Sequence, residues 1–146
     1  MANIKRGIKI PLPFRRKGYI IKVKVGGHDV VLQTGEYADG SLGEIWVETQ
    51  NSDSTTFRSI LNCFAVSISM GLQRGVPLED FIAQFVFYKF EPFGIVENHE
   101  ELKIVTSIVD FIFRELGSYY LNRKDLVQIK GGPVENIPRK NKKYYL

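Results

Sequence analysis

The residues best suited to chemistry in this sequence gather between positions 23 and 40, which read VKVGGHDVVLQTGEYADG. Paired glycines can cradle a phosphate, and a histidine among carboxylates can hold a metal. A phosphate loop needs its amides at a helix N-terminus, however, whereas Gly26-Gly27 lies between two strand patterns. His28 and His99 are far apart, and neither has a metal-binding partner at helical spacing. This stretch therefore predicts a hairpin, with neither a nucleotide loop nor a metal site.

Other side chains that enzymes use for catalysis stand alone. The one cysteine, Cys63, lies inside an apolar helical pattern, which predicts a buried structural thiol. Glu36 and Asp39 flank a turn and are expected to serve its geometry. The aromatic stretch YKFEPFG (88–94) has two interpretations: a surface that stacks a base, or a loop pinned to the core. The residues themselves predict no catalytic centre.

Composition indicates a single soluble domain. The chain has 146 residues, of which 44% are hydrophobic and 25% are charged, as in ordinary globular proteins. No apolar run reaches the length of about 18 residues that a membrane span needs, and the N-terminus lacks the pattern of a signal peptide. A single cysteine excludes an internal disulfide. We therefore expect a cytoplasmic protein that does not associate with membranes.

The charge is distributed unevenly along the chain. The net charge is +8 over residues 1–24, −9 over 25–122 and +5 over 123–146. Basic ends on an acidic body are typical of proteins that bind nucleic acid or acidic partners, but they are equally typical of solvated arms. Neither end carries the interleaved aromatic residues of single-strand binders, so nucleic-acid binding is the weaker interpretation.

Hydrophobic periodicity divides the chain into a strand region followed by a helix region. Alternation of apolar and polar residues predicts three strands, over 19–25, 28–34 and 44–50. They are joined by Gly26-Gly27 and by a turn at Asp39-Gly40. Apolar spacing of three to four predicts three helices, over 51–75, 75–85 and 101–121, with an aromatic loop over 87–101. The predicted class is α+β: an antiparallel three-stranded β-meander with three helices packed on it.

Flanking segments complete the predicted organisation. Pro11 and Pro13 favour an extended basic arm over residues 1–18, ahead of a domain over 19–128 and a basic polar tail over 129–146. The cap-type residues Asp53 and Ser54 open the first helix, which is apolar nearly all round. A helix of that kind is expected to be covered on more than one side, so we predict a homo-oligomer. In the third helix, the predicted apolar stripe contains Ile104, Ile108, Phe111, Ile112 and Leu116, and Ser107 and Asp110 lie on the opposite face.

Six strings along the chain, taken in order, resemble the C-terminal region of adenosylcobalamin-dependent (class II) ribonucleotide reductases, often called the TSCPD-type domain. They are RRKGY (15–19), VGGHDVVLQTGEYADGSLGEI (25–45), FRSILNCFAVSIS (57–69), GVPLEDFIAQF (75–85), KFEPFGIVE (89–97) and TSIVDFIFRELGSYYLNRKDL (106–126). The resemblance spans about residues 11–128. It implies that the catalytic barrel, with its redox cysteines and its contacts to adenosylcobalamin, lies upstream of this region, so no cofactor is expected on this chain. The family's C-terminal cysteine pair and the string TSCPD are absent.

The resemblance therefore implies a reductase context without reductase activity, because thiyl-radical reduction needs several cysteines. The leading hypothesis is a non-catalytic accessory or regulatory module that acts with a reductase catalytic subunit in deoxyribonucleotide synthesis. The alternatives are a protein that captures a nucleotide or a nucleotide-derived signal, and a basic module that binds nucleic acid. For nucleotide capture, the candidate phosphate-binding residues are Arg15, Arg16, Lys17 and His28. The candidates for stacking the base are Tyr88 and Phe90.

Overall fold

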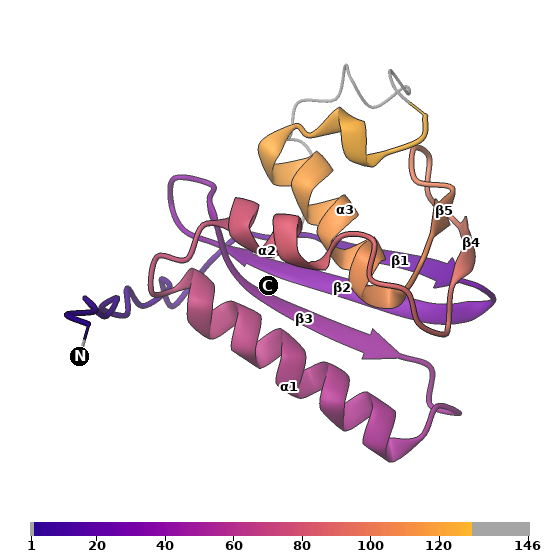
Figure 1. Cartoon of the computed structure of the whole chain (residues 1–146), viewed down its shortest axis with the longest axis horizontal. Helices are drawn as coiled ribbons and strands as arrows, with labels where there is room; N and C mark the ends of the chain where they lie inside the picture. Colours follow the sequence, from indigo (N-terminus) through magenta and orange to yellow (C-terminus); the bar gives the residue numbers. More distant parts are fainter. Residues whose placement is uncertain (1, 130–146) are drawn as a thin grey trace.

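A computed structural model describes residues 2–129 and shows an α+β fold, which confirms the predicted class (Figure 1). The strands are β1 (Ile20–Val25), β2 (His28–Glu36), β3 (Leu42–Thr49), β4 (Gly94–Glu97) and β5 (Ile104–Val105). The helices are α1 (Thr55–Leu72), α2 (Leu78–Phe85) and α3 (Ile108–Leu121), followed by a 3-10 turn, η1 (Lys124–Leu126). The tail predicted over 129–146 lies outside the described residues from position 130 onward.

The first three strands form the predicted meander. Val25 pairs with His28 across Gly26-Gly27, whose φ angles of 55° and 84° are those of a tight hairpin turn. Alternation then places Val23 and Val25 in the core and leaves Lys22 exposed to solvent. The hairpin and the facing of its side chains are thus as the sequence predicts.

Within residues 2–129, the sheet contains five strands rather than the three predicted, in the order β3-β2-β1-β4-β5. β4 comes from the segment predicted to be an aromatic loop, and it pairs with β1 through Lys24↔Glu97 and Val25↔Val96. β5 has only two residues and pairs with β4. Strands of two and four residues are too short to show an alternating pattern, so only their pairing defines them.

The third helix begins at Ile108 rather than at residue 101. Ser107 is its N-cap, since its Oγ accepts a hydrogen bond from the Asp110 backbone N–H at 2.9 Å. Ile104, predicted on the apolar stripe of this helix, lies in β5 and is 55% exposed. The prediction that Ser107 and Asp110 face away from the core is also wrong, because both are fully buried, where each makes hydrogen bonds.

Helix α1 runs beside β3, at the edge of the sheet (Figure 1). The Ser69 Oγ accepts a hydrogen bond from the Ile45 N–H at 3.0 Å and lies 2.9 Å from the Ala65 carbonyl oxygen, to which it donates. The Gln73 side chain donates to the Gly43 carbonyl at 3.1 Å. An edge strand otherwise presents such backbone groups to solvent, so α1 closes this edge.

Only one side of α1 is buried within the chain. The buried stripe consists of Leu61, Ala65 and Ile68. Four exposed side chains form a second stripe, called the outer face of α1 below: Ile60, Cys63, Val66 and Met70. Two predictions are therefore wrong for the single chain: that this helix is covered on more than one side, and that Cys63 is buried. Among residues 2–129, no helix has the length and apolarity needed to span a bilayer.

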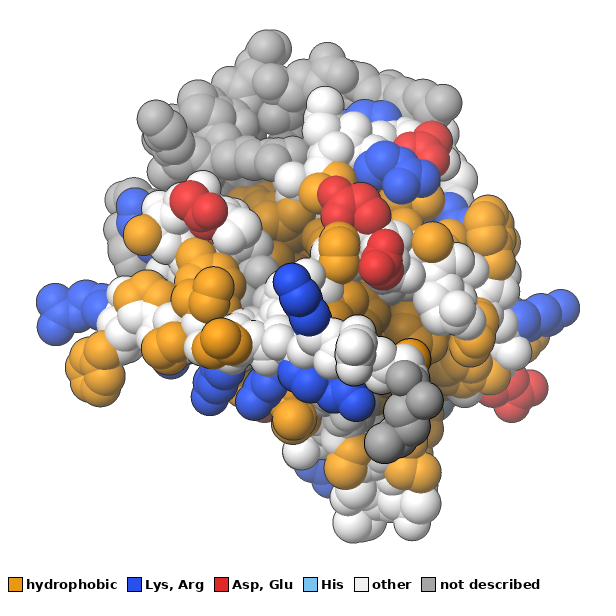
Figure 2. Space-filling view, turned by 60° about the vertical axis from the view of Figure 1, so that its left-hand side comes forward, with side chains coloured by type: hydrophobic (Ala, Val, Ile, Leu, Met, Phe, Trp, Pro, Cys, Tyr) orange, Lys and Arg blue, Asp and Glu red, His pale blue; other side chains and the backbone are white. Residues whose placement is uncertain are grey.

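Hydrogen bonds hold the basic arm before β1 at two points, one near its middle and one at its C-terminal end. The Ile10 N–H donates to the Gln73 carbonyl at 2.8 Å, beyond the end of α1. Nearer the sheet, the Glu36 N–H donates to the Lys17 carbonyl at 2.8 Å, so the arm continues the pairing of β1 with β2. Figure 2 shows the face from which the arm comes forward, where Lys and Arg side chains lie beside hydrophobic ones.

Candidate functional site

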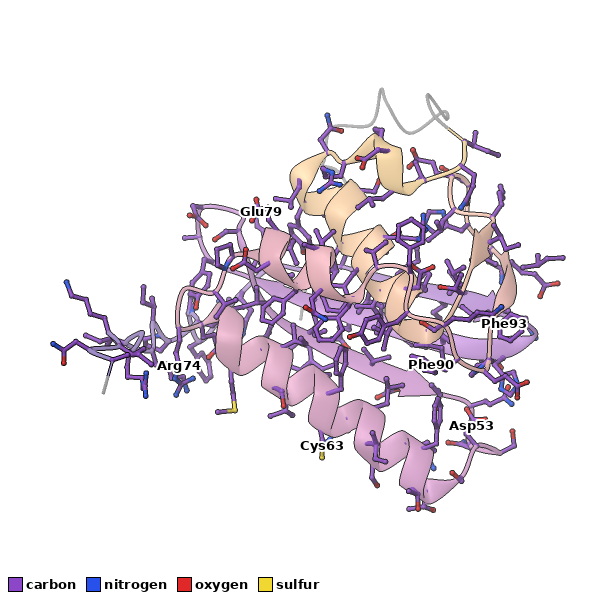
Figure 3. The ribbon with its side chains drawn as sticks, viewed as in Figure 1. Asp53, Cys63, Arg74, Glu79, Phe90 and Phe93 are labelled. Atoms are coloured by element: carbon purple, nitrogen blue, oxygen red, sulfur yellow. The ribbon has the colours of Figure 1, made fainter. Side chains whose placement is uncertain are left out.

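A surface pocket of about 430 Å³ lies at the end of the β1–β2 hairpin. Three segments meet there: the hairpin turn, the connection from β3 to α1, and the loop before β4. The side chains that give the pocket its chemistry are His28, Asp53, Ser54, Phe57, Glu91 and Phe93. Figure 3 shows Asp53 and Phe93 at this end of the molecule. The volume lies within the range of small-molecule sites.

Backbone contacts hold the hairpin turn against the loop that precedes β4. The Gly26 N–H donates to the Ile95 carbonyl at 3.0 Å. A Cβ atom on Gly26 would lie 2.3 Å from the Phe93 carbonyl oxygen, so only glycine permits this close approach. On the other wall, the Ser54 Oγ caps α1 by accepting from the Phe57 N–H at 3.1 Å. The pocket is therefore a product of the turn, the helix cap and the pairing of β1 with β4.

The Nδ1 atom of His28 faces two polar groups. It lies 3.3 Å from Asp53 Oδ1 and 3.2 Å from Gln50 Nε2. The Gln50 Oε1 accepts from the Asp29 N–H at 3.3 Å, which directs the amide nitrogen toward the ring. Nδ1 can accept from Gln50 or, when it carries a proton, donate to Asp53, but it cannot do both. Asp53 Oδ2 is buried and has no hydrogen-bond partner among the described residues.

The three basic residues predicted to bind phosphate lie at the far end of the hairpin from His28. Lys17 precedes β1 and His28 follows it, and a strand rises about 3.3 Å per residue, so roughly 26 Å separates them. Arg16 Nη1 lies 2.9 Å from Glu44 Oε1. Arg15 and Lys17 are exposed. The structure therefore does not bring these residues into one site with His28.

Tyr88 and Phe90, predicted to stack a base, lie in the loop between α2 and β4, and neither lines the pocket. The Tyr88 hydroxyl accepts from Gln84 Nε2 at 2.9 Å, and its ring stands edge-on to Phe85 at 5.4 Å between centroids. The Phe90 N–H donates to the Thr106 carbonyl at 3.1 Å, and the residue is 39% exposed. The six predicted residues thus fall in three places, and nucleotide capture by them stays a prediction.

A buried polar network joins α3 to the start of β1 and to the loop after β4. Glu115 accepts hydrogen bonds from the Tyr19 hydroxyl at 2.9 Å and from His99 Nε2 at 2.6 Å. His99 Nδ1 accepts from the N–H groups of Glu101 and Leu102 at 3.1 and 3.0 Å, so Nε2 is the nitrogen that donates to Glu115. Burial, and then the Glu115 carboxylate, raises the pKa of Tyr19 well above its ordinary value. This network joins α3 to the start of β1 and to the loop after β4.

A second buried cluster ties the loop after α2 to α3. The Arg114 Nε lies 2.9 and 3.0 Å from the two carboxylate oxygens of Asp110. The same carboxylate accepts from the Phe87 N–H at 2.7 Å and from the Thr106 N–H at 2.9 Å. The Arg114 guanidinium also lies 4.6 Å from the centroid of the Phe87 ring. These contacts fix the loop after α2 against α3.

Sequence reasoning found one pocket residue, His28, and assigned Asp53 only to the start of a helix. The remaining pocket side chains, among them Glu91 and Phe93, come from segments that are distant in sequence. For Glu91 and Phe93 the signal was the unusual aromatic composition of residues 88–94, for which a base-stacking surface was one of two interpretations. Within residues 2–129, no group of three His, Cys, Asp or Glu side chains could hold a metal ion.

Comparison with known proteins places these features in a family. The TSCPD domain profile matches residues 6–120. A vitamin B12-dependent ribonucleotide reductase of Agrobacterium fabrum is 47% identical over 125 residues, which are 86% of this chain and 10% of that protein. The corresponding protein of Bradyrhizobium diazoefficiens is 48% identical over 118 residues, 81% of this chain and 9% of its own. That of Rhodopirellula baltica is 34% identical over 114 residues, 78% of this chain and 11% of its own.

The chain thus spans only about a tenth of the length of these relatives. No solved structure matches it at a significant level. The profile covers most of the chain, from the arm through nearly all of α3, and agrees with the region of resemblance. The chain therefore belongs to the TSCPD domain family.

Proposed function

We propose that this chain is a non-catalytic module that acts with the catalytic part of a vitamin B12-dependent ribonucleotide reductase in deoxyribonucleotide synthesis. One observation carries the proposal: most of the chain aligns with a segment that makes up about a tenth of those reductases. The remaining nine tenths of the relatives have no counterpart in this sequence. The module would therefore act together with that larger part.

The side chains of the module support a role without chemistry of its own. Thiyl-radical reduction uses several cysteines, whereas this sequence has one, Cys63, which is exposed on α1 (Figure 3). The ionisable clusters around Glu115 and Asp110 are buried and engaged in holding loops to α3. A reductive centre built from these residues would have to break the contacts that maintain the fold.

Vitamin B12, which the names of the relatives imply, does not fit the pocket beside His28. A corrin with its nucleotide loop is larger than the drug-sized molecules that pockets of this volume enclose. The lining also contains two carboxylates and one imidazole, instead of a broad apolar floor. No step of the proposed function therefore passes through a cobalamin on this chain.

The outer face of α1 is the surface best suited to dock on the reductase. Of the 18 residues of α1, only Arg58 is charged, while Ile60, Val66 and Met70 are 64%, 50% and 51% exposed. The basic arm meets the end of this helix through the Ile10–Gln73 hydrogen bond. An apolar centre beside a charged rim is the usual composition of a protein interface.

The proposal is tested by complementation in trans. The 125 residues matched in the Agrobacterium fabrum reductase would be deleted, and this chain added to the shortened enzyme. We expect the chain to bind the shortened enzyme in calorimetry and to restore a measurable part of its lost formation of deoxyribonucleotide. Failure of both readouts, with circular dichroism showing the shortened enzyme folded, would falsify the proposal.

A matched pair of variants distinguishes docking by α1 from non-specific rescue. Val66→Lys places a charge in the centre of the outer face, and we expect it to weaken binding about tenfold or more. Ile95→Lys makes the same change at a 69% exposed position on β4 and should bind like the unmodified chain. Equal loss of binding in both variants would contradict docking through α1.

A thermal-shift screen with nucleotides tests the alternative function, nucleotide capture, since a bound nucleotide raises the melting temperature of the chain.

A further inference from the structure

The pocket beside His28 has a charge that the proposed function does not use. Two carboxylates line it, from Asp53 and Glu91, and the pocket lining contains no Lys or Arg. The imidazole of His28 is the one group there that can carry a positive charge. The pocket therefore favours a positively charged occupant over a negatively charged one.

The Asp53 carboxylate lacks a hydrogen-bond donor. Its Oδ2 is buried without a partner among the described residues, although its side chain lines the pocket. When Gln50 donates to His28 Nδ1, the other oxygen also loses the imidazole as a donor. A buried carboxylate oxygen without a donor is destabilising, and a positive charge held at the pocket-facing side of Asp53 would offset part of this cost.

Aromatic rings supply the rest of the lining. Phe57 contributes from the first turn of α1, and Phe93, which is 45% exposed, contributes from the opposite wall. The Phe93 ring already attracts a cation of this chain, since Lys89 Nζ lies 5.7 Å from its centroid. The walls are thus suited to the apolar stem of a cationic ligand and to its charged head.

Two other classes of occupant fit less well. An anion would meet Asp53 and Glu91, and the start of α1 is already capped by Ser54. A metal ion needs several ligands at once, and no suitable group of three exists among residues 2–129. An organic cation differs from both, because it brings N–H donors to the carboxylates and a stem to the rings.

We propose that this pocket binds an ammonium or guanidinium group carried on an apolar stem, with Asp53 as its main acceptor and Glu91 at the rim. Such a group occurs in free amines and in the Lys and Arg side chains of a protein. The proposal does not depend on the role in ribonucleotide reduction.

The test is a titration of the full chain, followed by ¹H–¹⁵N NMR. Agmatine, which carries both head groups, is the free probe, and the blocked peptide acetyl-Gly-Arg-Gly-amide is the side-chain probe. We expect resonances of residues around His28 and Phe93 to shift, with saturation at or below about 10 mM. Tighter binding of agmatine indicates a free amine, and tighter binding of the peptide indicates a protein side chain. Absence of saturable shifts with both probes overturns the proposal.

Paired variants assign the site. Asp53→Asn removes the carboxylate charge in the pocket and should weaken binding of the probes about tenfold or more. The control, Asp29→Asn, makes the same change next to His28 but outside the pocket, and it should weaken binding less than twofold. If Asp53→Asn fails to fold, Glu91→Gln, at an exposed position, is expected to weaken binding by a few-fold. Equal binding by the Asp53 or Glu91 variant and the unmodified chain counts against the pocket. Tighter binding of inorganic phosphate than of agmatine counts against its charge preference.

Discussion

Two tyrosines, Tyr19, which is buried, and Tyr120, which is partly buried, link the sheet to α3 through hydrogen bonds to carboxylates. The Tyr19 hydroxyl donates to Glu115 at 2.9 Å, and the Tyr120 hydroxyl lies 2.7 Å from a Glu36 carboxylate oxygen. Burial is the largest cause of the raised pKa of both phenols. Each is therefore protonated in the folded chain at a pH where the unfolded chain has lost the proton.

The raised pKa values predict a loss of stability in alkali. Above about pH 10, the ordinary value for tyrosine, the unfolded state binds fewer protons than the native state, so the free energy of unfolding falls as pH rises. The expected slope is about 1.4 kcal/mol per pH unit for each tyrosine, or about 2.7 for both. Below that pH neither phenol contributes to the slope. Urea unfolding between pH 8 and roughly 11.5 measures it.

A substitution identifies the source of this slope. Tyr19→Phe removes one phenol and should roughly halve the alkaline slope. Tyr120→Phe removes the other phenol and should lower the slope by about the same amount. An unchanged slope in Tyr19→Phe would show that the alkaline loss arises from other groups.

At the scale of elements, the contact between α1 and β3 depends on a serine within the helix. Ser69→Ala leaves the Ile45 N–H without its side-chain partner, and we expect the free energy of unfolding to fall by about 1–2 kcal/mol. Ser67→Ala is the matched control, because that exposed hydroxyl bonds only to the Cys63 carbonyl of the same helix. It should change stability by less than about 0.5 kcal/mol. Urea unfolding, with hydrogen exchange of the Ile45 amide, compares the two, and equal effects would refute the role of Ser69.

Alanine substitutions at the two glycines of the hairpin turn distinguish the cost of a strained backbone conformation from the cost of a steric clash. Both have positive φ, so an alanine at either costs about 1–2 kcal/mol. At Gly27 nothing lies within 4 Å of the added Cβ, whereas at Gly26 the Phe93 carbonyl must move. We therefore expect Gly26→Ala to lose about 1–3 kcal/mol more than Gly27→Ala in urea unfolding. Equal losses in the free energy of unfolding would mean that the loop before β4 can move away from the added Cβ at no energetic cost.

For the molecule as a whole, the outer face of α1 predicts self-association when no reductase covers it. An exposed apolar stripe on a helix with one charged residue is expected to pair with a second copy at high concentration. Light scattering should then give a mass that rises above the 16.7 kDa of one chain as concentration increases. Val66→Lys should remain at 16.7 kDa, and Ile95→Lys should behave like the unmodified chain. A constant single-chain mass would leave no support for the predicted homo-oligomer.

Local sequence patterns predicted correctly the elements whose apolar periodicity or turn residues extend over several positions. The alternation over β1 and β2, the Gly26-Gly27 turn and the cap at Ser54 all appear where the residues predict them. The start of α3 was misplaced because Ile104 and Val105 continue the helical spacing backward, while pairing with β4 draws them into a strand. Cys63 was wrongly predicted to be buried because apolar neighbours in the sequence do not specify which side of a helix is covered.

The α+β class, the hairpin at the centre of the sheet and the resemblance that the comparison confirmed all follow from the amino-acid sequence, because each rests on contiguous strings. The surroundings of His28 depend on how the chain packs, since Asp53, Glu91 and Phe93 join it in one pocket through the pairing of β1 with β4 and the start of α1. Packing also decided that Glu115 would meet Tyr19 and His99 in the core. Contacts between residues so far apart depend on how the layers pack, and no local period in the chain encodes that packing.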